Sequence, residues 1–330
     1  MPESYQPNTH QLKKTARLST SPAPASSVTP ASPADKPPMS NLSQRIVFGL
    51  LGAALLLGSV WLSAWTFAVF FAVVQAKMLL EFYRMMRQAG YKPAAMLGVG
   101  ISLLLFASVA ALTDFRVLAN ATAPEAVADL HYLRTSAVGL IALLPVLLIL
   151  REMYSWPRLN QPFAPFSNVG VALLGLLYVS LPMSLLSVVA FSGGSGYDYR
   201  RIVALLLLVW SSDIGAYAAG KTLGKHKLAP KISPGKTWEG AVGGFLLTLL
   251  VGYLLGYLLP ELSLAYRLVV AGTVAVFGPL GDLAESMLKR SVGVKDSGRI
   301  MPGHGGLLDR FDAFLFILPV LAVLQLVFGG

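Results

Sequence analysis

Residues 266–288 read YRLVVAGTVAVFGPLGDLAESML, and this stretch combines the two features that decide the fold. It is as long as the roughly 20 apolar residues that a helix needs to cross the hydrocarbon core of a bilayer. Four polar side chains at its end share the spacing i, i+3, i+4 and i+7: Asp282, Glu285, Ser286 and Lys289. That spacing places them on one helical face. The stretch therefore predicts a membrane helix whose polar stripe faces protein interior or an aqueous cavity.

Apolar runs of this length recur through the chain on both sides of that stretch. Apolar residues make up 55% of the 330 residues and charged residues only 13%, about half the share usual in a soluble domain. The pattern predicts an all-α polytopic membrane protein with about nine transmembrane helices. The expected spans are 46–62, 64–82, 95–113, 137–150, 167–191, 201–219, 239–259, 266–288 and 311–328.

The N-terminal segment differs from the rest of the chain. Residues 1–43 contain eight prolines and many Ser, Thr and Ala residues, too few apolar groups to offset chain entropy. We expect a disordered tail there, and no signal peptide, because no short apolar core precedes a cleavage site. The expected organisation is this tail, N-terminal transmembrane helices over 44–200 and a C-terminal catalytic region over 201–330.

The positive charges indicate how the helices are oriented. The net charge of +10 would suggest nucleic acid as a partner for a soluble protein, whereas in a membrane protein it indicates biased loops. With nine spans, 20 Lys and Arg fall on the side of the N-terminus, and the opposite side holds Arg116, Arg134, Arg200, Arg201 and Arg267. The richer side is predicted to be cytoplasmic.

Carboxylates gather in the C-terminal part of the chain. Five lie inside the predicted spans or at their edges: Asp213, Asp282, Glu285, Asp309 and Asp312. Such residues are kept in membranes mainly where they pair or bind ions. Because the chain has no cysteine and only four scattered histidines, a metal has to be held mainly by oxygen ligands, which favours a magnesium-like cation. We expect a common site rather than five separate ion pairs at helix ends.

Two loops next to these carboxylates, residues 220–238 and 289–310, hold ten of the 20 positive charges. Their glycines allow backbone amides to approach phosphate oxygens, and their Lys and Arg side chains neutralise polyphosphate. Basic, glycine-rich loops bracketed by carboxylates are suited to metal-assisted phosphoryl or nucleotidyl transfer. Residues 215–222, GAYAAGKT, also match the P-loop pattern, but no strand precedes them, so we expect their small residues to permit close helix packing.

Residues 286–312, SMLKRSVGVKDSGRIMPGHGGLLDRFD, resemble the motif of the phosphatidate cytidylyltransferase family. That motif is S-x-x-K-R, four residues, K-D, a gap to H-G-G, then D-R-x-D, and Met301 departs mildly from the Leu, Ile or Phe usual in the family. The stretch from Asp213 through KISPGKTWEG at 231–240 is similar to the bacterial members too. The resemblance is clear over about 200–330, and across 45–200 only the membrane character supports it.

The resemblance implies a nucleotidyltransferase of the bacterial cytoplasmic (inner) membrane that serves phospholipid biosynthesis. It joins CTP and phosphatidic acid into CDP-diacylglycerol and diphosphate. The implied cofactor is Mg²⁺, with a second cation left open, held by Asp282 and Asp309, with Asp213, Glu285 and Asp312 as further candidate ligands. The expected partners are the two substrates and the lipid bilayer, with no nucleic acid and with a homodimer left open.

The remaining candidate residues divide into two groups under this interpretation. The predicted catalytic residues stabilise the triphosphate and the leaving diphosphate: Lys289, Arg290, Lys295, Asp296, His304 and Arg310. The predicted substrate-binding residues hold nucleotide or headgroup phosphates: Lys221, Lys231, Ser233, Lys236, Thr237 and Ser286.

Three alternatives stay open at the level of the sequence. A CTP-using lipid kinase would transfer the γ-phosphate and release CDP. A related nucleotidyltransferase would act on an isoprenoid phospholipid. A transporter or channel with a cytoplasmic anion site would spread its carboxylates over several mid-membrane helices, often with broken repeats, whereas here they cluster at one end of three helices.

Overall fold

The computed structural model describes most of the chain from residue 41 onward. The described ranges are 41–119, 142–156, 165–193, 196–298 and 305–328, together with residues 135 and 139. Of the tail expected over 1–43, residues 1–40 lie outside the described residues, and 41–43 already belong to the first helix. His304 also lies outside the described residues.

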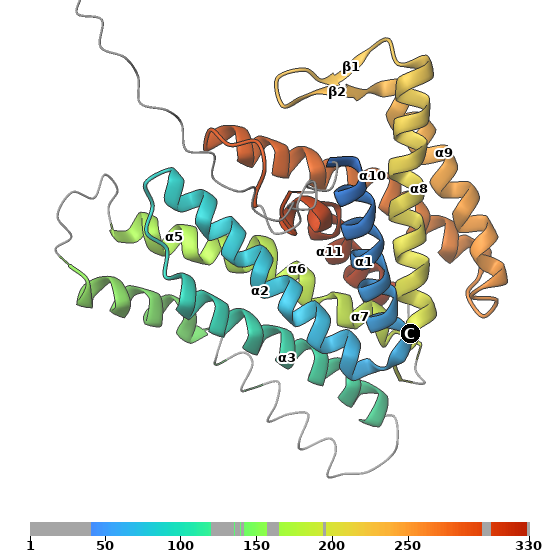
Figure 1. Cartoon of the computed structure of the whole chain (residues 1–330). Helices are drawn as coiled ribbons and strands as arrows, with labels where there is room; N and C mark the ends of the chain where they lie inside the picture. Colours follow the sequence, from blue (N-terminus) through green and yellow to red (C-terminus); the bar gives the residue numbers. More distant parts are fainter. Residues whose placement is uncertain are drawn as a thin grey trace, which may run out of the picture. The chain divides into compact units, whose positions relative to one another are not determined.

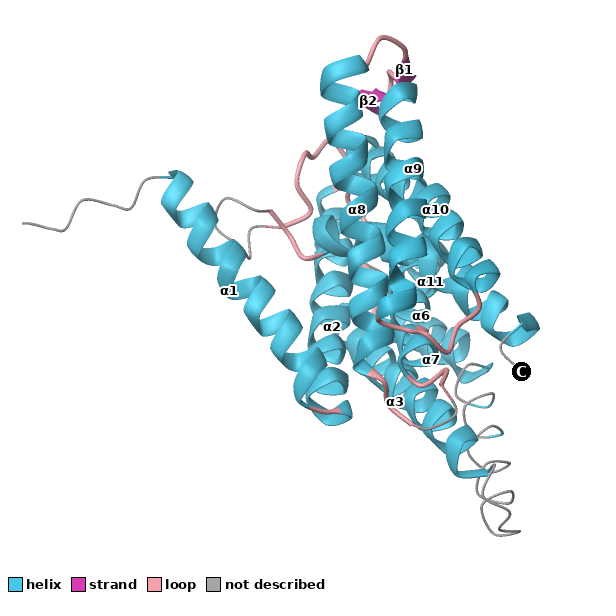
Figure 2. Cartoon of the chain, turned by 90° about the vertical axis from the view of Figure 1, so that its right-hand side faces the viewer, coloured by secondary structure: helices cyan, strands magenta, loops and turns pink. Residues whose placement is uncertain are grey.

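Helices dominate the described chain (Figures 1 and 2). The long ones are α1 (Asn41–Leu62), α2 (Ala64–Gln88), α3 (Ala95–Ala119), α8 (Tyr199–Leu223), α9 (Trp238–Leu254), α10 (Leu264–Ser291) and α11 (Leu308–Phe328). One further apolar segment is built from four short pieces: α5 (Pro165–Gly175), the π-helix η1 (Leu176–Ser180), α6 (Leu181–Ser184) and α7 (Leu186–Ala190). The 3₁₀ turn η2 (Leu255–Tyr257) extends α9, and residues 142–154 are helical as well.

Seven of the described helical segments are long and apolar enough to cross a membrane. The predicted all-α polytopic membrane protein is therefore confirmed. The expected spans at 46–62 and 137–150 are not among these seven, because only part of each is described in full: Val47–Leu62 of α1, and residues 142–154. Large apolar side chains remain exposed along the long helices, as expected of surfaces that contact lipid, for example Leu62, Trp65 and Met96.

Helix starts follow from capping side chains. Ser63 caps α2 and Ser263 caps α10, because each hydroxyl accepts a hydrogen bond from the backbone three residues later. Asp198 caps α8 in a similar way. These caps satisfy backbone donors at helix ends, where lipid could not replace them.

The helices α8 and α9 pack closely because small residues line their contact. A Cβ atom added to Gly215 would lie 2.8 Å from the carbonyl oxygen of Gly243 and 2.9 Å from Cα of Gly244. Residues 215–222 lie within α8 and not in a phosphate-binding loop, which agrees with the expectation of close helix packing.

A small β-hairpin joins α8 to α9, which the sequence analysis did not predict. The strands β1 (Lys227–Ala229) and β2 (Ser233–Thr237) pair antiparallel and extend beyond the ends of the helices (Figure 1). Both strands are short, and β2 contains Pro234 and Gly235, so the hairpin gives no alternating apolar pattern in the sequence. The hairpin brings Lys236 back toward α10, and this is how it contributes to the site.

Candidate active site

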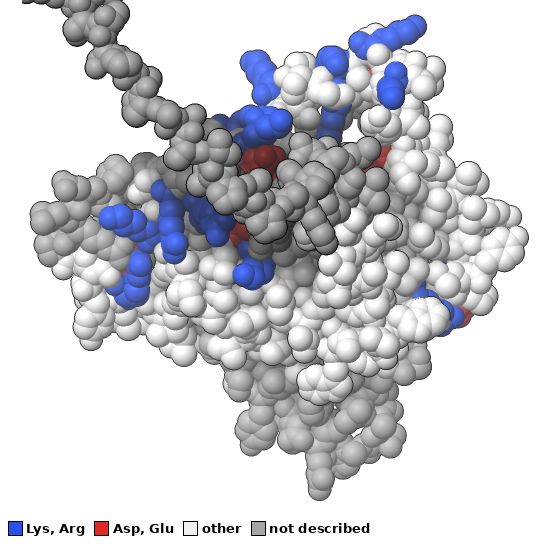
Figure 3. Space-filling model, in the orientation of Figure 1, with Lys and Arg blue, Asp and Glu red and all other residues white. Residues whose placement is uncertain are grey.

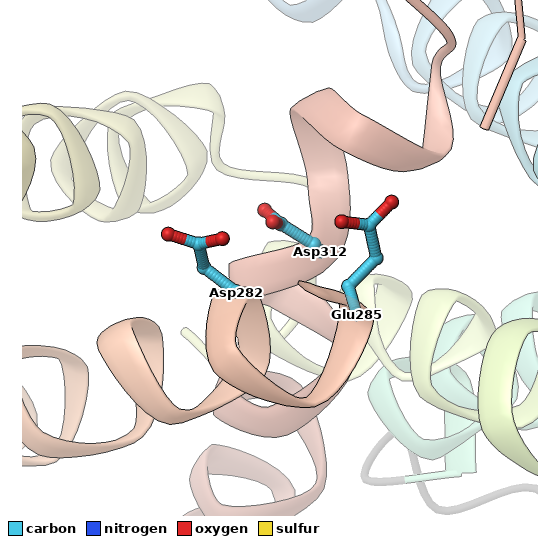
Figure 4. A group of neighbouring side chains, drawn as sticks. All are labelled: Asp282, Glu285 and Asp312. Carbon is cyan, nitrogen blue, oxygen red and sulfur yellow. The ribbon is translucent and has the colours of Figure 1, made fainter. Parts of the chain in front are cut away.

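Three carboxylates from two helices converge at the centre of the site (Figure 4). Asp282 and Glu285 are one turn apart on α10, and Asp312 lies on α11. One oxygen from each lies within 4.8 Å of the others. Three carboxylate oxygens at this spacing are a donor set that suits a hard divalent cation. Three of the five carboxylates that the sequence singled out therefore form one cluster that could hold a metal.

A glycine allows these two helices to approach. A Cβ atom at Gly281 would lie 2.6 Å from the carbonyl oxygen of Asp312 and 3.0 Å from Cα of Ala313. Because no side chain separates the backbones at this point, α10 and α11 cross closely enough for Asp312 to reach Asp282 and Glu285. The small residue beside Asp282 is therefore part of the geometry of the cluster.

Two lysines neutralise part of the negative charge. Lys236 Nζ, on β2, lies 2.6 Å from Asp282 Oδ2 and donates to the backbone oxygen of Pro279 (3.1 Å). Lys289 Nζ pairs with the fully buried Glu285 and lies 2.7 Å from Asp309 Oδ1. A buried carboxylate is tolerated only with such partners.

Asp309 organises the loop between α10 and α11. Its carboxylate accepts hydrogen bonds from the Ser297 hydroxyl (2.9 Å), the Ser297 amide (3.1 Å) and the Gly306 amide (2.8 Å). It therefore holds the two ends of this loop together and positions Lys289. The sequence analysis paired Asp309 with Asp282 as metal ligands, whereas the described geometry groups Asp282 with Glu285 and Asp312.

Glu81 belongs to this assembly, and the sequence analysis missed it. It lies on α2, its side chain is nearly fully buried, and its Oε2 accepts a hydrogen bond from the Leu308 amide (2.8 Å). The same oxygen lies 3.3 Å from the Ser297 hydroxyl, whose single proton it shares with Asp309. A carboxylate at the first residue of α11 also interacts favourably with the helix dipole. The signal in the sequence was a lone glutamate within an apolar span.

A cavity of about 700 Å³ opens onto these groups. Its polar end is lined by Asp213, Asp282, Lys289, Asp309, Arg310 and Asp312. Its remaining walls are apolar and come mainly from α1, α2 and α8, with Phe48, Leu55, Phe70, Val73, Leu206 and Trp210 among them. The volume is typical of small-molecule sites. The cavity thus joins an end that holds four carboxylates, one lysine and one arginine to an apolar wall.

The predicted substrate-binding residues lie in and around the hairpin. Ser286 donates to Asp282 Oδ1 (3.3 Å) and so lies at the carboxylate cluster. Lys221 and Lys231 are exposed, and Ser233 is half-buried on β2. The Thr237 hydroxyl accepts a hydrogen bond from the Gly240 amide (3.1 Å) and caps α9. The structure thus brings Lys236 and Ser286 to the carboxylates and leaves the two other lysines on the surface.

The predicted catalytic residues of the last loop divide in the same way. Lys289 and Arg310 line the cavity, whereas Arg290, Lys295 and Asp296 are exposed on the surface. In the view of Figure 3, Lys and Arg side chains gather in two areas, one at the top over the hairpin and one at the left of the molecule, and most of the remaining described surface is uncharged. Both areas are therefore expected to attract anions such as polyphosphates.

The fold and the site together define a class of protein: an integral membrane protein with a carboxylate and lysine cluster at the end of an apolar cavity. A family model described as the cytidylyltransferase family matches residues 43–328. The chain belongs to the cytidylyltransferase family.

Bacterial relatives share most of its length. A phosphatidate cytidylyltransferase of Staphylococcus aureus (strain COL) is 37% identical over 243 residues, which are 68% of this chain and 90% of the relative. The phosphatidate cytidylyltransferase of Staphylococcus epidermidis (strain ATCC 12228) is 37% identical over 242 residues with the same coverage. That of Staphylococcus haemolyticus is 40% identical over 173 residues, 52% of this chain and 65% of the relative.

Proposed function

We propose that this chain is a phosphatidate cytidylyltransferase. It transfers CMP from CTP to phosphatidic acid and releases CDP-diacylglycerol and diphosphate for phospholipid biosynthesis. The observation that carries the proposal is the cavity that joins an apolar wall to the carboxylate and lysine cluster, because it accommodates both a lipid tail and a phosphate group. Membership of the cytidylyltransferase family and the names of the relatives support the same activity.

In the proposed reaction, an oxygen of the phosphate monoester of phosphatidic acid attacks the α-phosphorus of CTP. A new P–O bond forms as the bond to the bridging oxygen of the β-phosphate breaks, and diphosphate leaves with the electron pair. Lys289 and Arg310, which line the cavity, neutralise the phosphates, and Lys236 exchanges its contact with Asp282 for a phosphate oxygen. Positioning and electrostatics suffice, so no protein nucleophile is required.

The carboxylates Asp282, Glu285 and Asp312 would hold the divalent cation, which we propose to be Mg²⁺. When bound, it supplies positive charge that stabilises the reacting phosphates. Asp309 keeps Lys289 in place, and Asp213 lines the same cavity as a further candidate ligand. The surface residues Lys221, Lys231, Arg290 and Lys295 attract the triphosphate toward the cavity.

The proposed setting is the cytoplasmic (inner) membrane, with the hairpin and the α10–α11 loop on the cytoplasmic side. This orientation follows from the nine spans expected from the sequence. With that number of spans, 20 Lys and Arg lie on the side of these loops and five on the opposite side, which is the bias of the positive-inside rule. The division into a tail, helices over 44–200 and a catalytic region over 201–330 belongs to the same proposal. A homodimer stays a prediction, which the mass of the detergent-purified protein will decide.

The test uses full-length protein in detergent with phosphatidic acid, Mg²⁺ and CTP labelled at the α-phosphorus. We expect label in the lipid fraction, release of diphosphate and loss of both on adding EDTA. Glu261→Gln, at an exposed acidic residue outside the cavity, serves as the matched control for Asp282→Asn. Transfer of label from the γ-phosphorus instead would establish a lipid kinase and contradict the proposal.

A further inference from the structure

A second cavity lies far from the carboxylates, between α8, α10 and α11. Its volume is about 60 Å³, and its polar lining includes Arg201 on α8, Arg267 on α10 and Gln325 on α11. Each lies 12 to 15 residues along its helix from a residue of the reaction site: Asp213, Asp282 and Asp312, respectively. At 1.5 Å per residue, the two sites are about 20 Å apart along all three helices.

Arg201 points a partly unsatisfied guanidinium into this cavity. Its side chain is 10% exposed, and one terminal nitrogen donates to the Ser192 hydroxyl (2.7 Å). Its buried Nε has no hydrogen-bond partner among the described residues, although it forms a long ion pair with Asp198 Oδ2 (3.7 Å). That carboxylate accepts closer hydrogen bonds from Arg200, at 2.9 and 3.0 Å. Arg201 therefore retains donor capacity for a ligand.

Arg267 contributes a second guanidinium whose Nε also lacks a hydrogen-bond partner among the described residues. This Nε is buried, and in the part of the chain that the structure describes Nη1 makes only a long contact to the Tyr253 oxygen (3.4 Å). Gly256 makes room for it, since a Cβ atom there would lie 2.8 Å from the guanidinium carbon. Buried donors without partners are costly, so two of them beside one cavity indicate a missing acceptor.

Charge and polarity restrict what that acceptor is. Among the described residues that line the cavity, two are arginines and none is acidic, and the other side chains are mostly Leu and Val. The acidic neighbours Asp198 and Glu261 are already engaged by Arg200. Arginine forks match tetrahedral oxyanions, and apolar walls match acyl chains. About 60 Å³ holds a phosphate group, while the rest of a lipid would extend along the apolar surface.

We propose that this cavity, the arginine pocket (Arg201, Arg267 and Ser192), binds the phosphate group of an anionic phospholipid as a site separate from the reaction. Cationic side chains at the far end of membrane helices are disfavoured by positive-inside bias, and a bound phosphate would compensate them. The occupant is a phosphodiester lipid, which does not serve as substrate in the proposed reaction. The pocket thus retains a lipid in the opposite leaflet and stabilises the packing of α8, α10 and α11.

The test measures lipid binding to the full-length chain in detergent by native mass spectrometry. The probes are phosphatidylglycerol, neutral phosphatidylcholine and inorganic phosphate. We expect Arg201→Gln with Arg267→Gln to weaken phosphatidylglycerol binding at least tenfold, and Arg201→Lys with Arg267→Lys to restore part of it. The matched control removes the same two charges from exposed positions of α2, Arg84→Gln with Arg87→Gln, and leaves binding unchanged.

The outcomes of the lipid-binding experiment test the arginine pocket separately from the proposed cytidylyl transfer. Equal phosphatidylglycerol binding by the wild type and the Gln variant overturns it, provided that both elute as single species in size-exclusion chromatography. If inorganic phosphate binds with the same affinity and displaces the lipid, the proposal that a lipid occupies the pocket is wrong, and the pocket binds free oxyanions instead. Cytidylyl transfer is assayed in the same preparations, and we expect the Gln variant to retain it, so a failure of the proposed function is distinguishable.

Discussion

Replacing Glu81 tests whether a buried carboxylate from α2 positions the loop between α10 and α11. The change Glu81→Ala removes the acceptor of the Leu308 amide and the Ser297 hydroxyl, and both of these residues are buried. A hydrogen bond to a charged group contributes about 1.5–3 kcal/mol. Because the single Ser297 hydroxyl proton lies closer to Asp309 (2.9 Å) than to Glu81 (3.3 Å), the loss is mainly that of the Leu308 amide hydrogen bond, about 1.5–3 kcal/mol. Because Ser297 also holds Asp309, the loss passes on to Lys289.

The assay is transfer of α-labelled CMP to phosphatidic acid, with kcat and KM measured separately. A loss of about 1.5–3 kcal/mol corresponds to a decrease of about ten- to hundredfold. We expect it mainly in kcat, because Lys289 would be misplaced while the apolar wall of the cavity is unchanged. Glu81→Gln keeps the shape and one carbonyl acceptor, so its loss should be smaller. The control is Glu261→Ala, an exposed acidic residue. Activity of Glu81→Ala within threefold of wild type, at unchanged thermal stability, would refute the positioning role.

Three further changes probe the carboxylate cluster. Asp282→Asn should lower transfer more than a thousandfold in the radiolabel assay, because the proposed cation loses a charged ligand. Expression and membrane insertion should persist. Near-normal activity would contradict the assignment of Asp282 as a metal ligand. Lys236→Met should raise the KM for CTP about tenfold in steady-state kinetics, since one charged contact to phosphate contributes about 1.4 kcal/mol or more. An unchanged KM would mean that Lys236 pairs with Asp282 but does not contact CTP. Gly281→Ala should lower the free energy of unfolding by about 1–3 kcal/mol and reduce activity, because the added Cβ meets the backbone of α11. The control Gly272→Ala should change neither, because the space around Gly272 is open. Equal melting temperatures for the two alanine variants would contradict this account of the helix crossing.

The α10 segment illustrates what could be predicted from the sequence. Its length and apolar character predicted a membrane helix, and the i, i+3, i+7 spacing placed Asp282, Glu285 and Lys289 on one face. In the structure Asp282 and Lys289 line the cavity and Glu285 is fully buried beside them. These properties are local, since they follow from a single helix and its solvent.

The contacts made by Glu81 illustrate what could not be predicted. Its partners Ser297 and Leu308 are 216 and 227 residues away in the chain, so no spacing rule connects them. The hairpin was missed for a related reason: its strands are too short and too rich in Pro and Gly to show a period, and its pairing depends on the ends of α8 and α9.

The sequence by itself determined that this chain forms apolar helices with acidic and basic groups at one end, because hydrophobic length and charge placement are properties of short segments. Only the tertiary structure decided which carboxylates meet. The glycine crossing at Gly281 brings Asp312 to Asp282, while Ser297 and Lys289 hold Asp309. The physical reason is that such pairings depend on how closely two helix backbones approach, which is fixed by packing across the whole bundle.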